Sequence, residues 1–148
     1  MEYLSNFPDR LRELMFYHDN IKSEALAKEL GVSGGTVRSW LRGETLISLA
    51  HAVTLADFFR CSLDYLAARS TIFEEVQPCG ALPPFYQRIR AVIHETGKTR
   101  YAVTKNTEIK DSHFTNWSRG KAPKLASACI LADFLEVSLD YLIGRRAY

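Results

Sequence analysis

The chain has 148 residues, of which 47% are hydrophobic, 24% charged and 11% aromatic, and this composition is too apolar for a disordered protein. No apolar run reaches the ~18–20 residues that cross a bilayer, and the N-terminal sequence lacks the features of a signal peptide, so we expect a cytoplasmic protein without a membrane segment. The net charge of +2 is unevenly distributed, because residues 1–78 carry 8 Lys and Arg against 11 Asp and Glu, whereas residues 79–148 carry 11 against 6. The first half is therefore mildly acidic and the second half clearly basic.

The first half of the chain predicts five short helices. Phe7, Leu11, Leu14 and Met15 recur at helical spacing on one apolar face, and Pro8 suits a first turn. The helices that follow are predicted at about residues 23–30, 33–41, 46–59 and 63–69.

Glycine and serine residues indicate where these helices end. Gly31 follows the second helix, because glycine adopts the left-handed conformation most easily. Ser33 is placed to cap the third helix, and Gly43 to close it. Val37 and Trp40 are expected to point into the core.

The second half of the chain repeats this pattern. Residues 55–70 and 131–146 match without a gap at 10 of 16 positions, including Leu-Ala-Asp-Phe and Ser-Leu-Asp-Tyr-Leu. Upstream, the Trp-x-Arg-Gly pattern of 40–43 recurs at 117–120. The duplication predicts an all-α protein built from two tandem five-helix domains joined by a short linker. The predicted first domain, linker and second domain are residues 1–69, 70–83 and 84–148.

The helices of the second half are predicted from equivalent signals. Pro83 and Pro84 precede its first helix, Gly97 ends that helix, and Thr99 is placed to cap the second. Its third helix is expected at about residues 111–118.

Two tight helical hairpins suggest the function. Residues 26–43 predict two helices joined by a Gly31-Val32-Ser33 turn, and they resemble the helix-turn-helix of the XRE family, the phage Cro and repressor type. Residues 103–120 resemble it as well. The Ser-Leu-Asp-Tyr-Leu-x-Gly-Arg ending at 138–145 is typical of this family, and Ala68 replaces its glycine in the first half. The resemblance implies that the third helix of each unit enters the major groove of DNA.

The resemblance also implies which residues contact the DNA. The start and middle of each third helix would read base edges. The N-terminus of each second helix, and the residues around each closing glycine, would hold phosphates. The implied base-reading residues are Thr36, Arg38, Ser39, Ser112, His113, Thr115 and Asn116. The implied phosphate contacts are Ser23, Arg42, Arg100, Lys110, Arg119 and Lys121.

The two copies differ where bases would be read. Gly34 and Gly35 remove side chains from the first recognition helix, so that Arg38 alone keeps a long reach there, and Glu44 adds repulsion near a phosphate. Together with the charge distribution, this predicts that the second domain is the stronger DNA binder.

The second hairpin departs from the family pattern too. Glu108 replaces the turn glycine, and Thr107 replaces the apolar Leu30. We therefore expect a turn of altered shape. Asp111 would face a phosphate unless it accepts a hydrogen bond from a cytosine amino group.

The expected function is a DNA-binding transcriptional regulator, a repressor, whose partner is double-stranded operator DNA. The alternative is a protein-interaction module, such as an antirepressor or antitoxin-like partner, with a homodimer or protein contact through the first domain. The sequence has no nucleophile–base constellation and no glycine-rich phosphate loop after a strand, so we expect no enzyme. Three widely spaced cysteines and four histidines without matching positions predict no disulfide framework, no metal and no cofactor.

Overall fold

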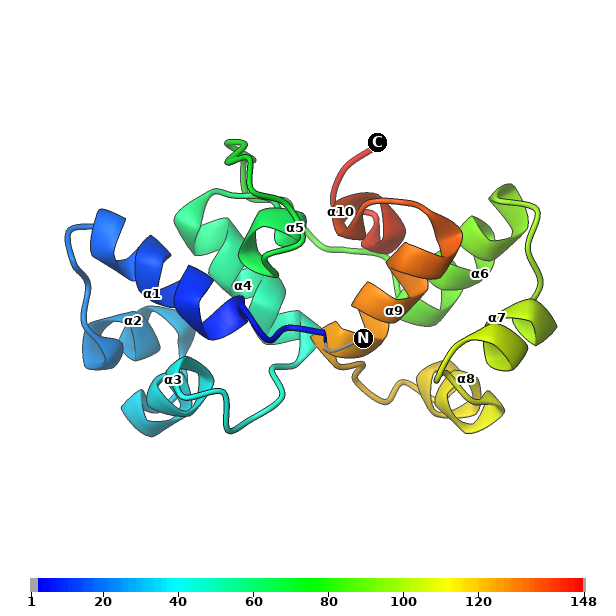
Figure 1. Ribbon diagram of the computed structural model, residues 1–148, viewed down its shortest axis with the longest axis horizontal. Coiled ribbons are helices and arrows are strands. Elements are labelled where there is room, and N and C mark those ends of the chain that lie inside the picture. The colour runs from blue at the N-terminus through cyan, green and yellow to red at the C-terminus, as the bar shows by residue number, and fades with distance from the viewer. Residues whose placement is uncertain (1–2, 148) are drawn as a thin grey trace. The chain divides into compact units, whose positions relative to one another are not determined.

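The structure is a computed structural model that describes residues 3–147, and over this range all its helices are α-helices and it has no named strand (Figure 1). The prediction of an all-α fold is confirmed. The chain divides into two compact units, residues 1–78 and 79–148. Within the described residues, no helix has the length and apolarity that a membrane crossing requires.

The first unit contains helices close to the predicted ones. Its second helix matches the prediction, whereas its fourth begins after Ser48, because the Ser48 hydroxyl accepts a hydrogen bond from the backbone N–H of His51 at 3.1 Å. Its last helix ends before the expected residue 69, because Ala68 adopts the left-handed conformation with φ 60°. The helices are α1 (Phe7–Tyr17), α2 (Ser23–Leu30), α3 (Gly34–Leu41), α4 (Leu49–Phe59) and α5 (Leu63–Leu66).

The second unit has five helices in the same order of lengths, long, short, short, long and very short. The predicted cap at Thr99 is confirmed, since its hydroxyl accepts a hydrogen bond from the N–H of Ala102 at 3.0 Å. The helices are α6 (Phe85–Glu95), α7 (Arg100–Asn106), α8 (Asp111–Ser118), α9 (Leu125–Leu135) and α10 (Leu139–Ile143).

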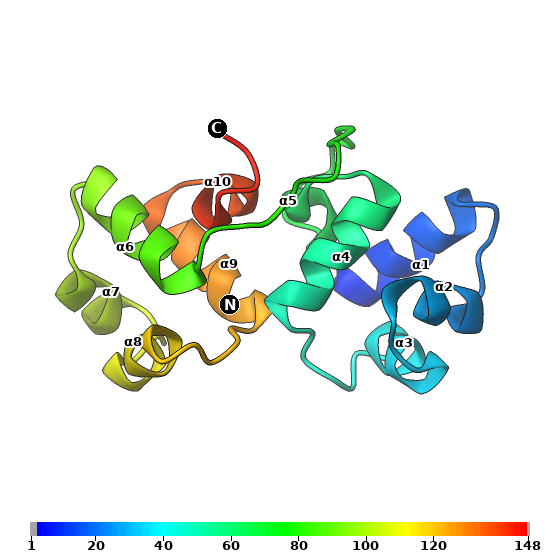
Figure 2. The same cartoon turned by 180° about the vertical axis from the view of Figure 1, so that it is seen from behind.

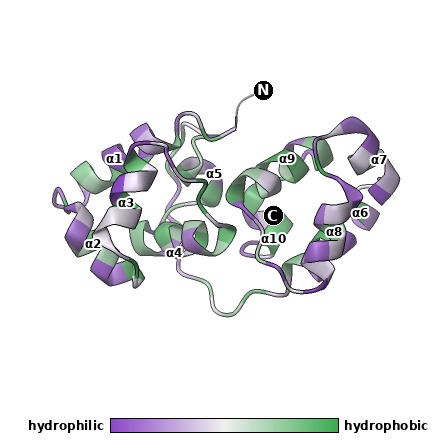
Figure 3. Ribbon diagram, turned by 90° about the horizontal axis from the view of Figure 1, so that it is seen from below, coloured by the Kyte–Doolittle hydropathy of each residue, from purple (hydrophilic) through white to green (hydrophobic). Residues whose placement is uncertain are grey.

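Each unit has its own core. The long helices α4 and α9 are largely hydrophobic (Figure 3), and Leu55 and Leu131 near their centres are fully buried. In the first unit α2 and α3 lie side by side next to α1, which both views of the ribbon show (Figures 1 and 2). Trp40 and Trp117 are 2% and 6% exposed, so both indoles anchor the third helix of their unit to its core, as predicted.

Part of the expected linker packs on the first unit. Cys61 and Glu75 form an isolated antiparallel bridge, and the backbone N–H of Val76 donates to the carbonyl of Arg60 at 3.1 Å. The Val76 side chain is buried, and the Phe73 ring packs edge-on against Tyr65. The first compact unit therefore extends to residue 78, beyond the end of its last helix.

The repeated Ser-Leu-Asp-Tyr-Leu segment has a structural role. In the second unit the Arg145 guanidinium donates to Asp140 Oδ1 at 2.7 Å, and both side chains are at most 1% exposed. In the first unit Arg69 pairs with Asp64, and these side chains are 21% and 18% exposed. Serine caps both helices. The matching residues of the repeat therefore hold the last helix of each unit in place.

A tyrosine on the same segment packs against the first helix of the unit. The Arg10 guanidinium lies over the Tyr65 ring at 3.8 Å, and the Tyr65 hydroxyl donates to Glu13 Oε1 at 3.3 Å. Burial raises the pKa of Tyr65 above its usual value, while the Arg10 charge opposes the shift and the Glu13 charge adds to it. The hydroxyl is therefore protonated at neutral pH and available as a donor.

The left-handed residue after each last helix gives a stability test. Ala68 occupies it at φ 60° and Gly144 at φ 83°. We expect Ala68→Gly to stabilise the protein by about 1 kcal/mol, because glycine has no Cβ penalty there. We expect Gly144→Ala to destabilise it by at least ~1–2 kcal/mol, because the conformation is unfavourable and the new Cβ would lie 3.0 Å from Pro83 Cγ. Urea denaturation followed by circular dichroism measures both, and a loss of stability in Ala68→Gly would contradict this explanation.

Candidate nucleic-acid interface

In the first unit a tight turn joins α2 to α3. Gly31 ends α2 in the left-handed conformation with φ 72°, and Ser33 caps α3 by accepting a hydrogen bond from the N–H of Thr36 at 3.1 Å. Leu26 and Val37, on the facing sides of the two helices, are fully buried. Of the first residues of α3, Gly34 is buried, whereas Gly35 and Arg38 are exposed.

The corresponding turn of the second unit has a different shape, as expected from its sequence. α7 ends at Asn106, and Thr107 is extended with φ −133° where the first unit has the last helical residue, Leu30. The Thr107 hydroxyl donates to the carbonyl of Val103 at 2.7 Å and accepts from the N–H of Ile109 at 3.1 Å. The threonine side chain thus supplies the turn with hydrogen bonds that the first unit makes through a left-handed glycine.

The N-terminal turn of α3 is covered by a carboxylate. Gly34 is buried, and a Cβ built on it would lie 2.1 Å from Glu24 Oε1. The same oxygen accepts a hydrogen bond from the Arg38 guanidinium at 2.8 Å, and the two side chains are 74% and 48% exposed. Gly35 is exposed and presents bare backbone. Arg38, the long-reaching side chain on this helix, is therefore held by an acidic residue of α2.

The other two candidate base readers of α3 have hydroxyl partners. The Thr36 hydroxyl lies 2.9 Å from the Ser33 hydroxyl, and the Ser39 hydroxyl is hydrogen-bonded to Thr45. Both side chains are only half-buried. Reading a base edge would require each of them to exchange or share this bond.

The candidate base readers of α8 form fewer side-chain hydrogen bonds than those of α3. Ser112 is exposed, Thr115 and Asn116 are half-buried, and none of the three side chains forms a side-chain hydrogen bond within residues 3–147. His113 Nδ1 accepts a hydrogen bond from the backbone N–H of Lys110 at 2.8 Å, which caps the helix and directs Nε2 away from that contact. The structure therefore brings four polar side chains to the start and middle of α8.

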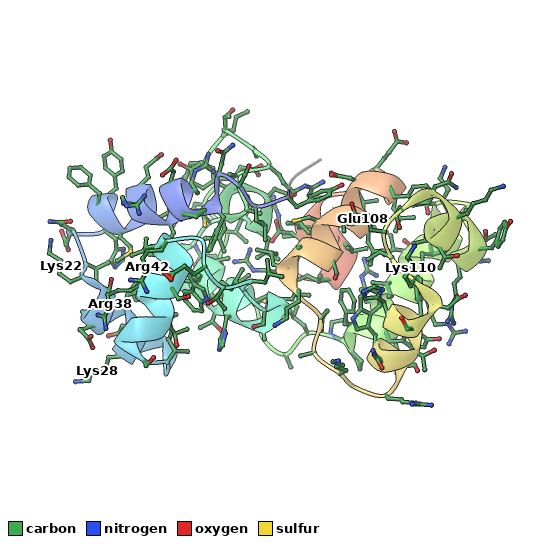
Figure 4. All side chains as sticks on the ribbon, turned by 60° about the horizontal axis from the view of Figure 1, so that its bottom comes forward. Lys22, Lys28, Arg38, Arg42, Glu108 and Lys110 are labelled. Carbon is green, nitrogen blue, oxygen red and sulfur yellow. The ribbon has the colours of Figure 1, made fainter. Side chains whose placement is uncertain are left out.

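Four cations of the first unit lie on or beside α2 and α3. Figure 4 shows Lys22, Lys28, Arg38 and Arg42 there. Arg42 forms an ion pair with Glu44, so both arginines are paired with carboxylates, while the two lysines are exposed and have no ion-pair partner within the described range. Ser23 is the first residue of α2 and half-buried.

The cations of the second unit are mostly unpaired. Arg100, at the first position of α7, donates to Asp111 Oδ1 at 3.1 Å and to the Asp111 carbonyl at 3.2 Å. Lys110, Arg119 and Lys121 are exposed, and none of them forms an ion pair with another described residue. Figure 4 shows Lys110 at the α7–α8 turn, where Glu108 is also exposed.

Glu24 and Lys28 belong to this surface although the sequence analysis did not include them among the site residues. Glu24 lies 14 residues before its partner Arg38, and no local pattern links the two positions. A sequence signal did exist, since a glycine at the first position of a recognition helix leaves room for a neighbouring side chain. Asp111 likewise pairs with Arg100 and is not an unpartnered acid facing phosphate.

These features define a helix-turn-helix protein: a capped recognition helix, a second helix packed across it, and cations on the exposed side. Residues 18–66 match the family model described as Helix-turn-helix, which covers α2, α3, α4 and α5. This segment of the first unit is therefore a helix-turn-helix of the XRE type, a DNA-binding regulatory domain. The match does not extend into the second unit. No curated protein and no solved structure matches the chain.

Proposed function

We propose that the protein is a sequence-specific repressor that holds operator DNA with helix-turn-helix surfaces in both units, the second unit contributing most of the affinity. It acts in the cytoplasm and uses no cofactor. The observation that carries the proposal is the contrast between the two surfaces. At the first interface both arginines are paired with carboxylates and only lysines are free, whereas at the second Arg100 is paired but Arg119 and Lys121 are exposed and have no ion-pair partner among the described residues.

Free cations support DNA binding for a thermodynamic reason. A cation that neutralises a phosphate releases counterions, and this release is the main sequence-independent contribution to affinity. A cation already paired with a carboxylate must break or share that contact first, so its contribution is smaller. The second unit also presents polar side chains on its recognition helix where the first presents Gly34 and Gly35.

The test of the proposal is selection of bound sequences from a random DNA library, followed by a gel shift at increasing salt. A DNA-binding repressor yields a recovered motif, and its affinity falls steeply with salt. Recovery of no motif together with a flat salt response would refute the proposal.

Asn116 is the sharpest test of base reading by α8. Asparagine makes a bidentate contact with adenine in the major groove. We expect Asn116→Ala to reduce the preference for the recovered base at one or two positions by roughly 1–3 kcal/mol per contact. The variant should lose less affinity on DNA whose sequence is already altered at those positions, because the contact is absent there in any case. Ser39→Ala, at the matching position of α3, is the comparison, and we expect a smaller effect from it because the first unit contributes less of the affinity. Binding to the recovered site and its single-base variants measures the effect, and an equal loss on every sequence would remove Asn116 from the readers.

A second candidate function for the first unit is contact with a protein. The observation is an exposed aromatic pair at the end of α1, where Phe16 and Tyr17 are 62% and 79% exposed and their rings pack edge-to-face. We expect the full chain to self-associate through this pair. The double variant Phe16→Ser with Tyr17→Ser should raise the dissociation constant of the dimer by at least about tenfold. Light scattering after size exclusion measures this, and a monomer at all concentrations would exclude the self-association.

A further inference from the structure

The second unit contains a basic cleft that shares only Arg100 with the interface described above. The cleft has a volume of about 470 Å³, within the roughly 300–1,000 Å³ of small-molecule sites. Its lining comes from one side of α6, the loop before α7, the first residue of α7, and α8. Its lining residues are Tyr86, Arg90, Ile93, His94, Lys98, Arg100 and Phe114.

All the charged side chains that line this cleft are cations or an imidazole. Arg90, Lys98 and Arg100 bring three cations to it, His94 adds an imidazole, and no carboxylate is among its lining residues. Like charges that converge in this way repel one another, and a bound anion would relieve the repulsion.

Aromatic rings hold these cations in position. The Arg90 guanidinium lies 5.6 Å from the Tyr86 ring, and Lys98 Nζ lies 5.4 Å from the Phe134 ring. Neither cation forms an ion pair with a described residue, so their donors are available to a ligand. Arg100 lies over the Phe114 ring at 4.7 Å and also pairs with Asp111, which links the cleft to the α7–α8 surface.

The first unit provides an internal comparison. At the positions that match the cleft residues in the repeat, its only cation is Arg12, with Phe16 in place of His94 and Ile21 in place of Lys98. Arg12 is already engaged, since it donates to Asp9 at 3.0 Å and to the Leu41 carbonyl at 2.9 Å. The convergence of cations is therefore specific to the second unit and is not a consequence of the shared fold.

We propose that this cleft binds a phosphate group, with Arg90 and Lys98 as the main cationic contacts and His94 as an additional donor. Phosphate suits the site because it carries up to two charges and several acceptor oxygens, which an arginine fork and an ammonium bind together. The group belongs either to a small phosphorylated molecule or to the DNA backbone. Binding of a small phosphorylated molecule is independent of the proposed function, whereas binding of the DNA backbone rests on it.

The experiment has two arms, both with the full chain. The first titrates pyrophosphate, AMP and adenosine by calorimetry, without DNA. We expect pyrophosphate or AMP to bind and adenosine not to bind. Arg90→Ala and Lys98→Ala should each weaken this binding by about tenfold, whereas Lys105→Ala, an exposed α7 cation outside the cleft, should not. Circular dichroism of each variant verifies its folding.

The second arm measures DNA binding against salt for the same variants. If the free ligands do not bind, but Arg90→Ala and Lys98→Ala each lower the salt slope by about 1, the phosphate comes from the DNA backbone. Two results overturn the proposal. One is that both variants leave ligand and DNA binding unchanged. The other is that pyrophosphate binding falls equally in Lys105→Ala, which indicates non-specific attraction to surface charge.

Discussion

Reversing two charges beside the closing glycine of the second unit, Arg119→Glu with Lys121→Glu, is expected to weaken DNA binding by about 50- to 100-fold at low salt, because two neutralised phosphates are lost. The salt slope should fall by about 2 for the same reason. Both side chains are exposed and flank Gly120, so the fold should be unaffected. Because we propose that both side chains contact phosphates and not bases, the loss should be equal on cognate and unrelated sequences.

Arg42→Glu in the first unit is the matched control, since Arg42 and Arg119 are equivalent in the repeat. Arg42 is paired with Glu44, so we expect its reversal to weaken binding only about threefold or less. Fluorescence anisotropy with a labelled duplex at several salt concentrations measures both variants. If Arg42→Glu abolishes binding and the double variant does not, the first unit, where the family match lies, is the main DNA binder.

Removing the buried guanidinium of the second unit, Arg145→Ala, is expected to destabilise the protein by about 3–5 kcal/mol. The side chains of Arg145 and Asp140 are 0% and 1% exposed, so the substitution takes the Arg145 ion pair away from a carboxylate that stays buried. The residue that follows the C-cap of α10 would also lose its contact with the first turn of that helix. We expect a large fall in the midpoint of urea denaturation followed by circular dichroism.

Two further variants test whether burial of the ion pair causes the expected loss of stability in Arg145→Ala. Arg69→Ala breaks the equivalent pair of the first unit, which is partly exposed, and should cost about 1 kcal/mol. The double variant Asp140→Leu with Arg145→Met replaces the buried pair by apolar side chains and should recover much of the lost stability. Equal costs for Arg145→Ala and Arg69→Ala would show that the buried charge does not dominate.

The helices, their order and the repeat could be predicted from the sequence, because these signals act over a few residues. The apolar face of Phe7, Leu11 and Leu14 and the caps at Ser33 and Thr99 depend on neighbours within one or two turns. The different shape of the α7–α8 turn was also predictable, because the sequence has Thr107 and Glu108 where the first unit has Leu30 and the turn glycine. Helix ends were less certain where a left-handed residue stops the helix, as at Ala68.

The sequence by itself thus determined the all-α class, the duplication and the helix-turn-helix, whereas the partners of the charged side chains were decided only by the tertiary structure. Arg38 meets Glu24, and Arg100 meets Asp111, across the two helices of each hairpin. The basic cleft likewise joins α6 to α8, with Arg90 and Phe114 far apart in the chain. Each exposed ion pair contributes about 1 kcal/mol or less to stability, so the sequence alone allows several pairings of nearly equal free energy. The packing of the helices then decides which charged side chains lie close enough to pair. Helix formation is local, but the choice among those partners depends on how the helices cross.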